Sequence, residues 1–388
     1  MSIFGISEPK HNQMAIEVVE VRSTDELREF VEFPFELYRD NPYWVPPIKS
    51  EERKALLPQK NPAMRDCDTI LWVARKDGKC VGRLAGIIHH KHNEKTGEKM
   101  VRFSRAEFVD DAEVVDALFA KAEGWAKEQG ASGIHGPLGF SNLDHQGMLV
   151  EGFDHIPSVV SEYHLPYYQE HMERLGYSKE MDWVEFRLSL AGFSLPEKAV
   201  RVNDMVKRRY GLKVINFTSR KELHECGQRV FEILNSAFRD LFSVVEFNQE
   251  TSSYYLNKYI PLLNPKFVKM IEDGEGNIAG FIIALPSLSK ALQKANGKVF
   301  PFGFYHIRKA LKNPTECDLL LTGVHPDWQG KGMVSLLFSE LLQELIGSGV
   351  QHLETTGMIE TNHKAIQHWK NFDHIQHKRK RCYRKKLV

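Results

Sequence analysis

Apolar and polar residues along this chain follow two alternating periods, the two-residue period of a β-strand and the three-to-four-residue period of a helix. Two apolar runs flank Asp77 and Gly78, a dipeptide that is a strong short-range signal for a β-hairpin. The first half therefore predicts this order: a strand over residues 14–23, a helix over 24–40 capped by Thr24, a hairpin over 69–88, a strand over 100–109, a helix over 112–129, a strand over 132–139, a helix over 167–177 and a strand over 182–190.

The second half repeats this order. Its elements are predicted as a strand over 211–218, a helix over 221–238, a hairpin over 265–285 with Asp273 and Gly274 in its turn, a strand over 316–324, a helix from about 331, a strand over 352–358, a helix over 362–372 and a strand over 379–387. Gly192 and Pro196 interrupt the pattern between the halves. We predict a mixed α/β (α+β) chain of two tandem domains, residues 1–195 and 196–388, each with a twisted, mainly antiparallel sheet and flanking helices.

The composition is that of an ordinary folded protein. A chain of 388 residues with 42% hydrophobic and 27% charged residues suits two globular domains. The net charge of +1 gives no overall field toward nucleic acid or an anionic membrane, so either contact would need a local patch. We therefore expect a small-molecule partner, no nucleic acid and no membrane, and we predict no oligomeric state.

The cysteines, histidines and N-terminal residues bear on compartment and metal binding. The five cysteines show no C-x-x-C spacing, which argues against a disulfide framework and a cysteine zinc site. Residues 1–13 lack a cationic segment followed by an apolar run, and no stretch reaches about 18 apolar residues. Adjacent histidines at 89–92 would point to opposite faces of a strand. We expect a cytoplasmic protein without a metal site.

A glycine turn at the start of a predicted helix is the strongest chemical signal in the chain. Residues 325–345 read HPDWQGKGMVSLLFSELLQEL and follow the predicted strand over 316–324. Amides at a helix N-terminus have no acceptor within the helix, and the helix dipole adds positive charge there. Gly330 and Gly332 would let the backbone approach a phosphate, and Lys331 would add charge.

These residues resemble the acyl-CoA loop of the GNAT superfamily of acetyltransferases, in which Q or R is followed by two residues, G, one residue, and G or A. The resemblance extends over nearly the whole chain, which is similar to tandem GNAT-like bacterial proteins. It implies acetyl-CoA or another acyl-CoA as cofactor. The residues implied to bind it are Val324, Gln329, Gly330, Lys331, Gly332, Met333, Val334 and Asn362.

The chain departs from the family pattern in three places. Val334 stands where glycine or alanine is usual, and its branched side chain would crowd the diphosphate. Trp369 replaces a tyrosine that protonates the departing thiolate in many relatives, and an indole N–H is a poor acid. In the first half, Asp110, Asp111 and Glu113 stand where the loop glycines belong, so we predict no CoA site there.

Acyl transfer to an amine requires a base, a polarised thioester carbonyl and a proton for the thiolate. Asp318, at the head of a predicted strand, is the first candidate for the base, and Glu354 in the following strand is the second. Residues 140–157 form a long loop, and ordered loops of that length are often functional. We predict that this region shapes the substrate pocket through Phe140, Asn142, His145, Tyr163 and Tyr167.

The predicted function is therefore that of an acyl-CoA-dependent N-acyltransferase, transferring an acetyl or short acyl group to the amine of a small substrate. Two alternatives stay open. One is a non-catalytic ligand-binding protein with the same tandem fold, and the other is a Fem-like transferase that takes its acyl group from aminoacyl-tRNA. The basic residues 377–388 suggest contact with phosphate, such as the 3′-phosphate of CoA, but no aromatic and basic pattern indicates a dedicated RNA-binding protein.

Overall fold

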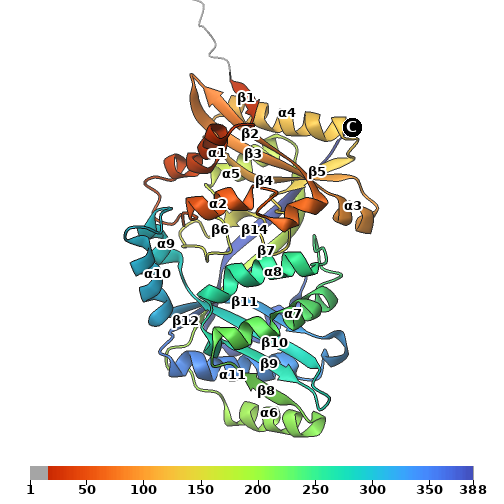
Figure 1. Ribbon diagram of the computed structural model, residues 1–388, viewed down its shortest axis with the longest axis vertical. Helices are drawn as coiled ribbons and strands as arrows, with labels where there is room; N and C mark the ends of the chain where they lie inside the picture. The colour runs from red at the N-terminus through yellow and green to blue at the C-terminus, as the bar shows by residue number, and fades with distance from the viewer. Residues whose placement is uncertain (1–15, 388) are drawn as a thin grey trace, which may run out of the picture.

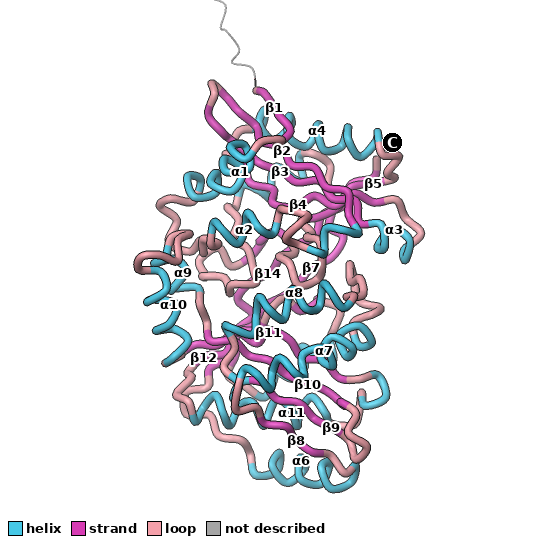
Figure 2. Tube along the Cα trace, viewed as in Figure 1, coloured by secondary structure: helices cyan, strands magenta, loops and turns pink. Residues whose placement is uncertain are grey.

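The computed structural model describes residues 16–387 as one elongated molecule of two stacked halves (Figures 1 and 2). The strands are β1 Glu17–Glu20, β2 Cys67–Lys76, β3 Lys79–His89, β4 Met100–Phe108, β5 Gly133–Gly136, β6 Met148–Glu151, β7 Ser178–Ser189, β8 Lys213–Asn216, β9 Val268–Glu272, β10 Ile278–Pro286, β11 Glu316–Val324, β12 His352–Thr355, β13 Met358–Ile359 and β14 His374–Lys386.

The helices lie between these strands. The α-helices are α1 Thr24–Leu37, α2 Lys49–Ala55, α3 His90–Thr96, α4 Ala112–Glu128, α5 Tyr167–Arg174, α6 Glu197–Tyr210, α7 Arg220–Ala237, α8 Gln249–Tyr259, α9 Ser289–Ala295, α10 Gly303–Lys312, α11 Met333–Gly347 and α12 His363–Ile366. The 3-10 turns are η1 Pro62–Asp66, η2 Ile260–Leu262, η3 Pro265–Phe267, η4 Pro326–Trp328 and η5 Gln367–Asn371. In residues 16–387 no helix combines the length and apolar character that crossing a bilayer requires.

The strands of both halves join one sheet, in the order β1-β2-β3-β4-β5-β14-β7-β12-β11-β10-β9-β8. The first five strands and β8 to β12 have the same pairing: three antiparallel contacts followed by one parallel contact. The two Asp-Gly hairpins therefore occupy the same topological place, β2–β3 and β9–β10. This confirms the predicted mixed α/β class with a mainly antiparallel sheet.

The last strands of the halves are exchanged at the centre of this sheet. β14, at the end of the chain, pairs with β5 of the first half, whereas β7 of the first half pairs with β12 of the second. β7 and β14 also pair with each other over most of their length. The predicted boundary after residue 195 falls in the connection between β7 and α6, but each half needs a strand from the other. The division into two domains at this boundary stays a prediction.

Helices cover both faces of the second half of the sheet. Along β9 and β10, successive residues belong to different cores: Ile271 and Ile282 pack with α11, whereas Met270 and Phe281 pack with α7 and α8. This alternation follows from the two-residue period of a strand. A long α-helix, α11, thus lies on one face, and α7 with α8 lies on the other (Figure 1).

Several local predictions are refined by the structure. Ser23, rather than Thr24, caps α1, and its side chain forms a capping box with Glu26. The second hairpin has a five-residue loop, in which Gly276 has the positive φ angle. The predicted strand over 14–23 begins with Met14 and Ala15, which lie outside the described residues. Helices α2, α3, α6, α8, α9 and α10 were not predicted.

A buried acid in the first half makes stability depend on pH. Glu107 is 3% exposed, and its Oε2 accepts hydrogen bonds from Tyr38 at 2.5 Å and Tyr168 at 2.8 Å. Burial raises the pKa of Glu107 to about 7, although Arg83 opposes the shift. The folded state therefore binds a proton more tightly than the unfolded state does.

We expect Glu107→Gln to remove this pH dependence. In the native protein, the contribution of Glu107 to stability is complete below about pH 4.5 and is lost as pH rises toward about 7, by up to about 1.4 kcal/mol per pH unit. Urea unfolding of both proteins at several pH values between 5 and 8 measures the difference. Parallel pH profiles for the two proteins would contradict the raised pKa.

Candidate functional site

The glycine turn lies between β11 and α11. Gly330 and Gly332 have φ angles of 75° and 85°, which residues with a Cβ rarely adopt. Gly332 is the N-cap of α11, so the amides that follow it have no acceptor within the helix. The glycines are needed to turn the chain, and the same turn presents amides and the positive end of a helix dipole to an anion.

Two predicted residues beside the turn are held by packing. The Lys331 ammonium lies 4.8 Å from the Trp328 ring centroid and 5.8 Å from that of Tyr210. Val334 is partly buried against the core formed by α11. Lys331 and Val334 are therefore held next to the turn, as the sequence analysis predicted for residues that bind the cofactor.

β11 and β12 separate next to the turn. Their parallel pairing starts at Glu316 with His352 and ends at Leu319 with Thr355. β11 continues to Val324, with β10 along its other edge. Within residues 16–387, positions 320–324 therefore have no strand neighbour on the β12 side. The Leu320 carbonyl oxygen accepts a hydrogen bond from Thr356 Oγ1 at 3.2 Å, and that of Val324 accepts one from Gln329 Nε2 at 3.4 Å.

A cavity of about 1700 Å³ opens from this edge. It exceeds the range of about 300–1,000 Å³ that is usual for small-molecule pockets. Most of its lining is apolar and comes from the second half, including Val230 and Phe231 of α7, Tyr255 of α8, and Ile282 and Leu320 of the sheet. The predicted residues that line it are Asn142, Val324, Gln329, Gly330, Gly332, Met333, Val334 and Asn362.

Asn362 and Trp369 also border the cavity. Asn362 caps α12 by accepting a hydrogen bond from the Ala365 amide at 3.3 Å. Trp369 is buried, and its indole N–H donates to Met358 Sδ at 3.2 Å. The indole is therefore engaged with the protein and is not directed as a donor into the cavity.

The predicted bases lie side by side in a buried charged cluster. Asp318 and Glu354 are register partners across β11 and β12, but neither lines the cavity. Burial, together with repulsion from Glu354, raises the pKa of Asp318 well above its usual value. Burial opposes ionisation of Glu354 too, but Lys378 keeps the pKa of Glu354 below its usual value. Of the two carboxyl groups, Glu354 is the one whose surroundings favour the ionised form, so it is the better candidate for a base.

Lysines complete this cluster at the centre of the sheet. Lys378 is 1% exposed, and its ammonium contacts Glu354 and lies 3.3 Å from Glu185 Oε2. Lys380 lies 3.0 Å from Glu185 Oε1, and the two lysines lower the pKa of Glu185 to about 2 despite its complete burial. The cavity touches the cluster at Lys380.

Two groups of side chains have the composition of a metal site, Glu185 with Glu354 and His377, and His135 with Glu180 and Cys382. In the first group, lysine ammonium groups already contact both carboxylates. In the second, His135 Nδ1 pairs with Glu180 at 2.9 Å, and burial raises the pKa of the Cys382 thiol. We assign a metal to neither group.

The predicted substrate residues are dispersed. Phe140, Tyr163 and Tyr167 pack in the first half and do not line the cavity. His145 pairs with Glu162 at 2.9 Å. Asn142 is the one of the five that reaches the cavity, because Asp144 and Ser141 of its loop bond the Tyr255 hydroxyl of α8.

The N-terminus of α4 in the first half differs from that of α11, because it is capped by a side chain. Asp111 caps this helix by accepting a hydrogen bond from the Glu113 amide at 3.0 Å and pairs with Lys76 at 2.7 Å. Asp110 pairs with His171 at 2.8 Å. The protein's own carboxylate thus occupies the helix N-terminus, and the absence of a CoA site from the first half stays a prediction.

The arginine and lysine side chains of β14 form ion pairs with acidic residues of neighbouring elements. Arg379 and Arg381 pair with Asp182 of β7, and Lys385 pairs with Glu123 of α4. Arg384 pairs with Glu98 and Glu180. These side chains bind acidic residues of the first half, so the expected phosphate contacts of this segment have no support in the structure.

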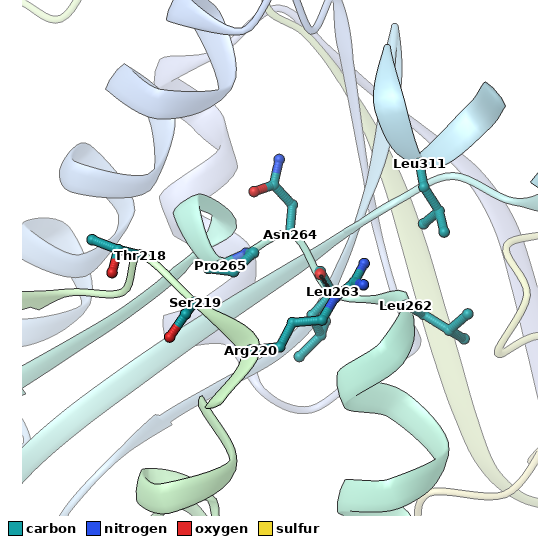
Figure 3. Close-up of a pocket in the computed structure, with 8 residues that line it drawn as sticks. All are labelled: Thr218, Ser219, Arg220, Leu262, Leu263, Asn264, Pro265 and Leu311. Atoms are coloured by element: carbon teal, nitrogen blue, oxygen red, sulfur yellow. Dashed lines mark hydrogen bonds between the residues drawn. The ribbon is translucent and has the colours of Figure 1, made fainter. Parts of the chain in front are cut away.

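A second pocket, of about 370 Å³, lies away from the turn (Figure 3). Thr218, Ser219 and Arg220 border it, together with residues 262–265 and Leu311 of α10. The Arg220 Nε donates to the Leu263 carbonyl oxygen at 3.3 Å. The pocket contains no predicted site residue, and we assign it no function.

Sequence reasoning missed the apolar wall of the cavity. Tyr254, Tyr255 and Tyr259 follow helical spacing in α8, and Tyr255 and Tyr259 reach the cavity. That spacing was the available signal for this helix. Lys380 and Trp183 gave no signal, because their position depends on the pairing of β7 with β14.

The sequence and the fold of this chain are similar to those of several known proteins. Protein YghO of Escherichia coli K12 is 30% identical over 369 residues, which cover 94% of this chain and 93% of YghO. A protein of Caulobacter vibrioides named bacterial ceramide synthase is 27% identical over 383 residues, 96% of this chain and 98% of that protein. The structure of a tandem GNAT protein from the clavulanic acid biosynthesis pathway matches with a TM-score of 0.56 at 15% identity, covering 96% and 99% of the two chains. No family profile matches the chain.

Proposed function

Because the chain belongs to the family of Escherichia coli protein YghO and has the fold of tandem GNAT acyltransferases, we propose that it is an acyl-CoA-dependent N-acyltransferase acting on a long-chain amine. The proposal rests on one observation, which is that three features of the structure adjoin one another. These are the glycine turn at the N-terminus of α11, the open edge of β11 and the apolar cavity.

The residues at the turn fit an acyl-CoA. The amides after Gly332 and the α11 dipole suit a diphosphate, and no carboxylate caps this helix, in contrast to α4. A built Cβ at Gly330 would meet no atom within 4 Å, so the turn is open on that side. When bound, acyl-CoA supplies an acyl group activated as a thioester.

The chain's own groups suit acyl transfer beyond the turn. The open edge of β11, residues 320–324, offers backbone amides that can stabilise negative charge developing on a carbonyl oxygen. The largely apolar lining of the cavity beside that edge strengthens electrostatic interactions there. Lys378 lowers the pKa of Glu354, which lies one residue before the end of the β11–β12 pairing, and the role of Glu354 as base stays a prediction.

Cavity size supports a longer chain than the acetyl or short acyl group predicted from the sequence. A cavity of about 1700 Å³ with a largely apolar lining suits hydrocarbon chains. A relative of almost the same length is named bacterial ceramide synthase, and a ceramide is an amide of a fatty acid with a long-chain amino alcohol. Both observations favour an acceptor and an acyl group of lipid type.

Calorimetric titration with acetyl-, octanoyl- and palmitoyl-CoA tests this proposal. Each buried methylene contributes about 0.8 kcal/mol, so we expect palmitoyl-CoA to bind at least about 100-fold more tightly than acetyl-CoA. Leu320→Trp should reduce this preference by filling the cavity beside β11, whereas the volume-conserving control Leu320→Met should keep it. Equal affinity for all three chain lengths would contradict a lipid-type acyl group.

The same titration separates the alternatives. A non-catalytic binding protein would bind acyl-CoA and form no amide when incubated with palmitoyl-CoA and sphinganine. A Fem-like transferase would fail to bind any of the three acyl-CoA compounds. Release of free CoA that depends on sphinganine is the result expected for the proposed enzyme.

A further inference from the structure

An aromatic-basic segment projects from one side of the molecule. We use this name for residues 289–312, which include α9, α10 and their connection (Figure 1). Phe300 and Phe302 are each 74% exposed, Tyr305 is 59% exposed and Phe304 is 47% exposed. All exposed large aromatic side chains found in residues 16–387 belong to this segment. Burial normally removes such side chains from water, so their clustering here indicates a contact surface.

The charged side chains of this segment are all positive. The segment contains six lysine or arginine residues and neither aspartate nor glutamate, although the whole chain has a net charge of only +1. Lys290 pairs with Glu316 at 3.1 Å. The others are exposed and have no ion pair within the described part of the chain: Lys294, Lys298, Arg308, Lys309 and Lys312. The segment is therefore a local cationic patch in a nearly neutral protein.

The inner side of the segment is fixed to both halves of the molecule. Ile307 and Leu311 of α10 pack against the core formed by α7 and α8. Gln293 donates hydrogen bonds to the carbonyl oxygens of Pro42 and Trp44, and the Lys49 amide donates to Gly297. Because these contacts hold the backbone, the aromatic side chains are presented outward from a defined surface.

We propose that the aromatic-basic segment docks the protein on the surface of a bilayer that contains anionic lipids. Aromatic side chains suit the headgroup region, where an apolar ring enters the boundary of the acyl chains. Lysine and arginine around them suit lipid phosphates, and the absence of carboxylates removes repulsion from an anionic surface. The proposal departs from the expectation, drawn from the net charge, that the protein contacts no membrane.

Cosedimentation of the full chain with vesicles tests the proposal without acyl-CoA, so its outcome is independent of the proposed acyl transfer. Vesicles of phosphatidylglycerol and phosphatidylcholine in equal parts are compared with phosphatidylcholine alone. We expect binding to the anionic vesicles, weakened by salt. Phe300→Ser with Phe302→Ser should lower the partition coefficient by about tenfold or more, whereas Ile375→Ser, at another exposed apolar residue, should not.

A second pair of variants tests the charge. Lys309→Glu with Lys312→Glu should abolish binding to anionic vesicles, whereas the same charge change at exposed lysines elsewhere, Lys121→Glu with Lys221→Glu, should preserve most of it. Circular dichroism confirms that each variant is folded.

Two outcomes would overturn the proposal. The first is that the wild-type protein stays in the supernatant with both kinds of vesicle. The second is that light scattering shows a dimer which Phe300→Ser with Phe302→Ser converts to a monomer, without any effect on vesicle binding. In that case the segment is an interface between two copies of this chain.

Discussion

Gly332→Asp is expected to weaken acyl-CoA binding by about 100-fold or more, roughly 2.8 kcal/mol. Gly332 is the N-cap of α11, so the substitution places a carboxylate where the diphosphate is proposed to meet the first helix amides. Two unit charges 4 Å apart repel each other by about 4 kcal/mol at an effective dielectric constant of 20. The carboxylate would also accept hydrogen bonds from the amides that the ligand needs, as Asp111 does in α4.

Gly332→Asn is the matched control. Asparagine has the size of aspartate, and both tolerate the positive φ angle of 85° at this position better than most residues do. The nearest atom to a built Cβ is Val206 Cγ2 at 3.4 Å, so neither side chain meets a severe clash at its base. We therefore expect Asn to weaken binding by less than about tenfold.

Calorimetry with palmitoyl-CoA measures the difference between the two variants. Lys331→Ala provides a further comparison and should change the affinity by no more than about fivefold, because an exposed cation contributes about 1 kcal/mol or less. If Asp and Asn weaken binding equally, the glycine serves only to turn the chain. The proposed acyl-CoA site would then lose its main support.

Lys378→Met is expected to lower the free energy of unfolding by about 3–5 kcal/mol. Lys378 is 1% exposed and contacts two carboxylates, Glu354 and Glu185. Glu185 keeps a partner in Lys380, but Glu354 keeps only His377, at 3.2 Å. The substitution therefore leaves a buried carboxylate without its lysine, and removing one partner of a buried pair costs more than removing both.

The double variant Lys378→Met with Glu354→Gln should recover most of this loss, because it leaves no unpaired charge at Glu354. Without Lys378, the pKa of Glu354 rises above its value in the unfolded chain. The destabilisation of Lys378→Met should therefore grow as pH increases from 5 to 8. Urea unfolding at both pH values tests this, and a loss that is independent of pH and of Glu354→Gln would contradict the ion-pair explanation.

Glu354→Gln by itself examines the predicted base. If Glu354 removes a proton from the acceptor amine, the variant loses activity while binding palmitoyl-CoA normally, and a higher pH partly restores the rate. If the Glu354 carboxylate only balances the charge of Lys378, the double variant Lys378→Met with Glu354→Gln stays active. Activity is measured as amine-dependent release of CoA.

The amino-acid sequence determined the local elements and the position of the glycine turn. The strand over 316–324 was predicted with its observed ends, and both Asp-Gly hairpins lie in the predicted places. The period of apolar residues and the backbone preference of glycine act over a few residues, so they can be read directly from the chain. For the same reason, the start of α11 could be predicted from the sequence to within two residues, at about 331 against the observed Met333.

Only the tertiary structure decided which strands are neighbours and which polar groups meet. The exchange of β7 and β14 brings Lys378 and Lys380 to Glu185 and Glu354, and it turns a basic segment into partners for acidic residues. Strand edges offer the same hydrogen-bonding groups to any partner, so the local sequence does not specify the choice. The same holds for Phe140, Tyr163 and Tyr167, because an aromatic side chain suits a core as well as a pocket, and only its surroundings in the fold distinguish the two.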